Sequence, residues 1–158
     1  MLRFEDVPTE INDIFREVRA EHFPELRNAN IKILYDLKKR QSNGKITLAR
    51  IQKTNDLLRY LTIDESAENE GHDYIIFIDK KIFDNITREE KIKILRHELR
   101  HTLVDIDSNT PYKLIPHDIE DFHEEIELNK NEPMWRQRLA NLCQDLYGQE
   151  ADDREWLS

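Results

Sequence analysis

The sequence predicts an α+β domain, in which a small group of strands follows one amphipathic helix and precedes three further helices. Apolar residues recur at helical spacing near the N-terminus and again in the C-terminal half, and short β-rich runs lie between them. The length of 158 residues suits one domain, and no internal repeat or Gly/Ser-rich linker divides the chain. We therefore expect one domain over residues 1–158, with 149–158 as an acidic C-terminal tail.

The N-terminal half predicts one helix and two strands. Apolar residues after Pro8 are spaced as on one helix face, so we expect an amphipathic helix that ends before Pro24. The runs 30–36 and 45–51 are typical of strands, and the Asn43-Gly44 pair between them favours a hairpin or an equivalent connection with a longer loop. The apolar helix positions are Ile11, Ile14, Phe15 and Val18.

The run Tyr74–Ile78 carries the strongest strand signal, because it is short, β-rich and nearly continuous in apolar character. It is either the most buried strand or an edge strand that an extended peptide could pair with. The run 54–61 fits a helix or a strand, 64–71 is typical of a loop, and His72 is expected at the surface. Helices are expected over Thr87 to about Val104, about Asp118 to Leu128, and Met134 to Tyr147.

Most of the net charge lies at the C-terminal end. Residues 117–158 carry 12 acidic and 4 basic side chains, so −8 of the net charge of −9 falls there. Because no long basic cluster offers phosphate neutralisation, we expect no direct nucleic-acid partner. Cys143 is the only cysteine, which excludes an intramolecular disulfide and a Cys-based zinc cluster. A signal-peptide core and a run of ~20 apolar residues are both lacking, so we expect a cytoplasmic protein with no membrane partner.

Residues 97–101 read His97-Glu98-Leu99-Arg100-His101, an H-E-x-x-H motif. On a helix, residues four apart share a face, so the two imidazoles can bind one Zn²⁺ while Glu98 stands beside the metal-bound water. Zinc lowers the pKa of that water to about 7, and a glutamate can pass its proton to a leaving amine. The motif therefore predicts His97 and His101 as metal ligands and Glu98 as the general base.

The predicted helix around the motif is well specified. Thr87 and Glu90 form a capping box at its start. At about 100° per residue, its apolar residues form one stripe, and the motif residues lie on roughly the opposite side with Ile94. The histidines are therefore expected outside the core, although a solvated helix face would show the same pattern. The stripe consists of Ile92, Leu95, Leu99 and Leu103.

A third ligand is expected downstream, because catalytic zinc usually has three protein ligands and one open position. His117 lies 16 positions after His101 and would complete a three-histidine site. Glu120 or Asp121, 19 and 20 positions after His101, would instead make a site of two histidines and one carboxylate. The same stretch also fits an acidic helix N-terminus that the helix dipole favours, with Asp118 as the cap.

The motif at 97–101, the run from His117 to Phe122 and the later Tyr147-Gly148 together resemble the phage metallopeptidase family and, more distantly, SprT-like zincins. The resemblance covers about Tyr74 to Gly148. An acidic insertion between Gly148 and Trp156 departs from the family pattern, and the chain lacks the basic or zinc-ribbon extensions of SprT-like proteins that act near DNA.

This resemblance implies a zincin-like metallopeptidase fold with a small β-sheet and an active-site helix that carries the motif. It implies that the zinc ligands are His97, His101 and His117, with Glu98 as the general base. Asp118 and Asp121 would then orient a ligating imidazole.

We therefore expect a zinc-dependent metallopeptidase that hydrolyses peptide bonds in a peptide or protein substrate. The acidic C-terminal stretch predicts substrates that are neutral or basic near that side of the cleft. One alternative is a non-catalytic, zinc-stabilised binding or regulatory protein, in which Asp121 or His123 closes the open position. In another, the motif is accidental and the domain is an acidic interaction module.

Overall fold

The computed structural model of the protein describes residues 2–42, 45–116, 125, 128–132 and 134–147. The strands are β1 (Phe4–Asp6), β2 (Ile31–Asp36), β3 (Gln41–Ser42), β4 (Lys45–Ile46), β5 (Ala49–Lys53), β6 (Tyr74–Asp79), β7 (Thr102–Val104) and β8 (Tyr112–Leu114). The α-helices are α1 (Thr9–His22), α2 (Asp56–Leu61), α3 (Lys80–Phe83), α4 (Arg88–Leu99) and α6 (Trp135–Tyr147). The 3₁₀ turns are η1 (Pro24–Leu26), η2 (Ile63–Glu65) and η3 (Ala67–Asn69).

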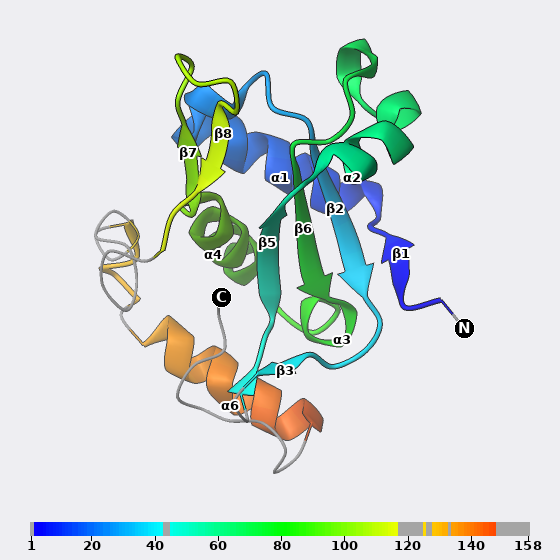
Figure 1. Ribbon diagram of the computed structural model, residues 1–158. Helices are drawn as coiled ribbons and strands as arrows, with labels where there is room; N and C mark the ends of the chain where they lie inside the picture. The colour runs from blue at the N-terminus through cyan, green and yellow to red at the C-terminus, as the bar shows by residue number, and fades with distance from the viewer. Residues whose placement is uncertain (1, 43–44, 117–124, 126–127, 133, 148–158) are drawn as a thin grey trace.

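The main sheet has the strand order β1-β2-β6-β5 (Figure 1). β6 lies in its interior, parallel to β2 and antiparallel to β5, with Ile76 opposite both Ile33 and Ile51. The pairs β3–β4 and β7–β8 form separate two-stranded antiparallel sheets. β5 is therefore an edge strand of the main sheet.

One face of the sheet is covered by helices. In Figure 1, α1 lies behind the sheet, and α4 lies beside β5 and contacts α1. Ile33 and Tyr35 of β2 are buried while Leu34 between them is partly exposed, because side chains alternate between the two faces of a strand. Within the described part of the chain, no helix combines the length and the apolar character needed to cross a bilayer.

A single carboxylate joins the end of β6 to α3 and α6. The Tyr147 hydroxyl donates to Asp79 Oδ2 at 2.7 Å, and Asp79 Oδ1 accepts the Ile82 N–H at 2.9 Å as the N-cap of α3. Burial raises the pKa of Asp79. These contacts hold the last described helix against the sheet.

The structure confirms several predicted elements. The helix before Pro24, the strand over 30–36 and the helix ending at Tyr147 are α1, β2 and α6. The ambiguous run 54–61 contains the helix α2, which Asn55 caps by accepting the Leu58 N–H at 2.8 Å.

The strand predicted at Tyr74–Ile78 is β6, and its interpretation as the most buried strand is confirmed. Its interpretation as an edge strand is wrong, because β2 and β5 flank it. The Asn43-Gly44 pair lies outside the described residues, but β3 and β4 on either side of it are antiparallel. The run 45–51 divides between β4 and β5, and β5 pairs with β6 rather than with β2.

The helix predicted over 87–104 is shorter than expected. α4 ends at Leu99, and Arg100 follows as its C-cap with helical backbone angles. The Thr102 hydroxyl donates to the Leu99 carbonyl at 2.7 Å, and residues 102–104 then pair with β8. Cross-strand pairing, with β-branched residues at both ends of β7, outweighs helix propensity here. His101 therefore follows the helix rather than lying on it.

His72 is buried, with 5% of its surface exposed, so the expectation of a surface position is wrong. Its carbonyl accepts the Thr54 hydroxyl at 2.6 Å, which draws the loop against the start of β6. Among the described residues, neither ring nitrogen has a hydrogen-bond partner. Burial lowers the pKa of His72, because the charged imidazolium loses its hydration.

Replacing His72 by Gln should make stability less sensitive to acid. The folded pKa lies below the unfolded value near 6.5, so below that pH the unfolded chain binds a proton that the folded chain excludes. Native stability should therefore fall as the pH drops through 6.5, until the folded pKa is reached. Urea unfolding at a series of pH values should show a steeper loss for the wild type than for His72→Gln, and parallel curves would contradict the assignment.

Candidate metal centre

α4 presents two of the three motif residues. The predicted capping box is present: Thr87 Oγ1 accepts the Glu90 N–H at 3.2 Å, and Glu90 Oε1 accepts the Thr87 N–H at 3.1 Å. This cap fixes the start of the helix, and its last turn carries His97 and Glu98.

The predicted faces of the helix need correction. His97 and Glu98 are fully buried, whereas Leu103, a predicted member of the apolar stripe, is 46% exposed on β7. The physical reason is that α4 contacts both α1 and β5, so its C-terminal half is covered on more than one side. His97 and Glu98 therefore lie inside the molecule and not on a solvated face, whereas His101 is partly exposed.

The structure brings His97, Glu98 and His101 together. One ligand atom from each lies within 4.8 Å of the others, and the two imidazole centroids are 5.6 Å apart. An ion midway between two such atoms would be at most 2.4 Å from each, half of 4.8 Å. That is close to zinc–nitrogen distances of about 2.0–2.1 Å. Each pair of these ligand atoms therefore suits a metal ion in donor type and spacing, and the three together form a group that could hold one.

His101 is oriented by the chain beyond β8. Its Nδ1 lies 2.7 Å from the carbonyl oxygen of Ile115, and the Ile115 N–H donates to the His101 carbonyl at 2.6 Å. Because a carbonyl only accepts, Nδ1 carries the proton and Nε2 keeps the lone pair. Metal-ligating histidines characteristically donate their second ring N–H in this way.

Glu98 is a buried carboxylate with few polar contacts. It is fully buried, and within the described part of the chain neither of its oxygens makes a hydrogen bond that meets normal geometry. Burial raises the pKa of Glu98 well above its ordinary value, and the nearby Ile51 N–H only partly offsets this. His97 Nε2 lies 3.9 Å from Glu98 Oε2. A buried carboxylate with such weak compensation among the described residues is costly, and a cation or a proton donor beside it would lower that cost.

The edge of β5 faces the motif. The Thr54 N–H donates to the Asp73 carbonyl and the Asp79 N–H to the Leu48 carbonyl, so the even-numbered positions of this strand bond to the β6 side. Since backbone direction alternates along a strand, the N–H and C=O of Ile51 point away from β6. This places the Ile51 N–H toward Glu98, as the electrostatics of Glu98 also indicate.

A second buried carboxylate binds two arginine side chains next to the motif. Glu125 is fully buried and accepts Arg96 Nε at 2.6 Å and Arg100 Nε at 2.9 Å. Arg96 also donates to Asn129 Oδ1 at 2.6 Å, and the Arg100 guanidinium lies 4.6 Å from the Phe23 ring centroid. We call Arg96, Arg100 and Glu125 the arginine clamp. It fixes the turn of α4 on which His97 and Glu98 lie.

Sequence reasoning missed the arginine clamp and the bond from Ile115. The signal for the clamp is the spacing of Arg96 and Arg100, which places two cations on one helix face and requires an acidic partner. The partner itself could not be chosen among the many downstream acids. The remaining candidate residues, His117, Asp118, Glu120, Asp121 and His123, lie outside the described residues.

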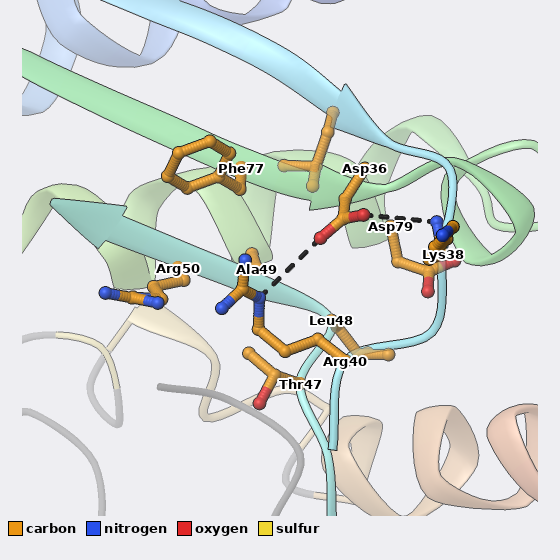
Figure 2. A pocket seen from close by; sticks show the side chains of 10 residues that line it. Asp36, Lys38, Arg40, Thr47, Leu48, Ala49, Arg50, Phe77 and Asp79 are labelled. Carbon is orange, nitrogen blue, oxygen red and sulfur yellow. Dashed lines mark hydrogen bonds and ion pairs between the residues drawn. The ribbon is translucent and has the colours of Figure 1, made fainter. Parts of the chain in front are cut away.

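Two hollows away from the motif carry no candidate site residue. One, of about 10 Å³, lies beside Asp36 (Figure 2), and this carboxylate is already paired with Arg3 Nε at 2.9 Å and Arg40 Nε at 3.6 Å. Its volume is about that of one water probe. The other, of about 560 Å³, lies between the end of α1 and the η2–η3 turns, and His72 and Tyr112 line it. The chemistry therefore concentrates at the end of α4.

Two imidazoles and a buried carboxylate that converge at a helix end form the kind of site that metal-dependent hydrolases use. A family model described as "Putative phage metallopeptidase" matches residues 2–147, so the chain belongs to this family. The match extends the sequence resemblance through the N-terminal half, and membership implies a peptidase with a metal cofactor. Searches of curated proteins and of solved structures each found no match.

Replacing Glu125 by Gln should destabilise the fold by about 3–5 kcal/mol, because the buried Arg96 and the partly buried Arg100 lose their counter-charge. Glu132→Gln is the matched control. Glu132 is 44% exposed and pairs with Lys93, which lies on α4 as Arg96 does. Its substitution should have a clearly smaller effect, because an exposed ion pair contributes little to stability. Urea unfolding measures both, and equal effects of the two substitutions would contradict the clamp.

Proposed function

We propose that this protein is a zinc-dependent metallopeptidase with a single zincin-like domain. His97 and His101 would hold the zinc ion, and Glu98 would be the general base. The observation that carries the proposal is the fully buried Glu98 carboxylate, without a hydrogen-bond partner in the described structure, beside two imidazoles whose ligand atoms converge. A structural histidine pair would not require a fully buried acid at this position.

The chain's own residues supply most of the required chemistry. Bound zinc would act as a Lewis acid and lower the pKa of a coordinated water to about 7. Glu98 accepts the proton of the attacking water and delivers it to the leaving amine. The Ile115 carbonyl holds His101 in the tautomer with the proton on Nδ1 and the lone pair on Nε2. Burial of Glu98 and His97 keeps competing water away and strengthens each electrostatic contact.

For the third ligand we propose His117, with Glu120 or Asp121 as alternatives and Asp118 as an orienting group. The contacts of described residues on both sides support this choice. Ile115 is bonded to His101 on one side, and Glu125 is clamped to Arg96 and Arg100 on the other. Position 117 follows Ile115 by only two residues, and two residues span at most about 7 Å, so a ligand from this position is compatible with the place of Ile115 beside His101.

The substrate that fits this arrangement is an extended segment of a peptide or protein. The edge strand β5 passes the motif, and the alternation of its hydrogen bonds turns the backbone groups of Ile51 away from β6, with the N–H toward Glu98. An extended peptide can pair with such an edge and bring a carbonyl to the metal. The sequence suggested Tyr74–Ile78 as the strand that an extended peptide could pair with, and we propose β5 for this role instead.

A non-catalytic zinc-stabilised binding or regulatory protein is the second candidate. The complete burial of His97 and Glu98 favours it, because structural zinc sites are closed whereas catalytic sites keep an open position. In that case zinc removal should unfold the protein, and no variant or condition should produce hydrolysis.

Replacing Glu98 by Gln should preserve zinc binding and lower peptide hydrolysis by about 10²–10⁴-fold, the usual contribution of a general base. Glu89→Gln, the same substitution at an exposed position of α4, is the control and should leave the rate unchanged. Hydrolysis of a casein digest or a quenched peptide library measures the rate. A fully active Glu98→Gln enzyme would disprove the proposed base.

Replacing His101 by Ala should weaken zinc binding at least roughly 100-fold, since even residues that only orient a ligand contribute 10–100-fold. Competition with a chromophoric chelator measures the affinity, and the wild type should bind one zinc per chain. His22→Ala, at the end of α1, serves as the control. Unchanged affinity in His101→Ala would place the metal elsewhere.

A further inference from the structure

A small pocket opens directly beside the candidate metal centre. It has a volume of about 230 Å³ and lies at the edge of β5, where β8 ends. Its lining includes His101 itself, so anything bound in it lies next to the proposed metal. The lining residues are Arg50, Ile51, His101, Leu114 and Ile115.

The size of the pocket fits one side chain. Sites for whole drug-sized ligands measure about 300–1,000 Å³, and this pocket is smaller. One wall is formed by Leu114 and Ile115, each of which is 37% exposed. Apolar surface of this kind gains from contact with an apolar side chain, because both leave water.

The pocket is lined on its β5 side by a positively charged residue, Arg50. Arg50 contributes to the lining, and its Nη2 donates to Gln52 Oε1 on the same strand at 3.4 Å. A guanidinium keeps its charge at any pH that proteins tolerate. A substrate Lys or Arg that entered would therefore meet a like charge beside an apolar wall.

We infer that this pocket is a specificity subsite, which takes a bulky apolar side chain such as Leu or Phe from the substrate residue next to the scissile bond and rejects Lys and Arg. The inference rests on the proposed function and adds the substrate class. It differs from the expectation, drawn from the acidic C-terminal stretch, of neutral or basic substrates: on the β5 side the relevant local charge is Arg50.

Hydroxamates test the pocket without requiring turnover. The probes are N-acetylated hydroxamates of Leu, Phe, Ala and Lys, whose hydroxamate group chelates zinc while the side chain enters the neighbouring pocket. Calorimetric titration of the zinc-loaded full chain should show Leu and Phe binding about 10-fold or more tighter than Ala, the scale on which apolar pockets discriminate. The Lys compound should bind most weakly.

Two substitutions assign the preference to the pocket. Leu114→Ala should reduce the Leu-to-Ala affinity ratio to below about 3-fold, and Arg50→Glu should raise the affinity for the Lys compound by about 10-fold. Leu103→Ala is the matched control, because Leu103 lies in the same hairpin, is 46% exposed and does not line the pocket. It should keep the wild-type ratios. Should one variant fail to fold, the other still tests the assignment, since it lies on a different strand.

The outcomes separate this inference from the proposed function. If the chain binds zinc but binds all four hydroxamates equally, the subsite is wrong and the metal centre stands. The subsite is also wrong if the apolar preference survives Leu114→Ala and the Lys compound gains nothing from Arg50→Glu. If the chain binds no zinc at all, both proposals fail.

Discussion

The burial of Glu98 beside two imidazoles is the constraint on which the rest of the site depends. A buried carboxylate whose oxygens make no hydrogen bond of normal geometry among the described residues costs several kcal/mol unless something at the site compensates its charge. The fold tolerates this cost because α4 lies against both α1 and β5 and has no freedom to turn Glu98 outward. The packing that buries the Glu98 carboxylate also places it beside the ligand atoms of His97 and His101.

The helix that carries Glu98 is secured at both ends. A capping box fixes its start, and the arginine clamp fixes its last turn through Glu125. Beyond the helix, the paired bonds between His101 and Ile115 determine the tautomer of the second imidazole. Glu125 and Ile115, which support the motif, therefore both come later in the sequence than α4. The β7–β8 hairpin returns the chain so that Ile115 lies beside His101.

Local patterns predicted what depends on neighbouring residues. The H-E-x-x-H motif, the capping box at Thr87, α1 and the strand β6 all followed from spacing and composition. The end of α4 at Leu99 did not, because pairing between β7 and β8, which lie about ten residues apart, decides it. The clamp on Glu125 joins residues 25 and 29 positions apart, and His72 is buried by contacts with distant segments. Such long-range contacts leave no periodic trace in a sequence.

Anomalous diffraction at the zinc edge, from crystals grown with Zn²⁺, tests most directly whether these side chains form a metal centre. The expected result is one anomalous peak at about 2.0–2.1 Å from an imidazole nitrogen of His97 and from Nε2 of His101, with the Glu98 carboxylate beside it and one coordination position open to solvent. A peak elsewhere in the molecule, or no peak beside these histidines at saturating zinc, would contradict the central claim.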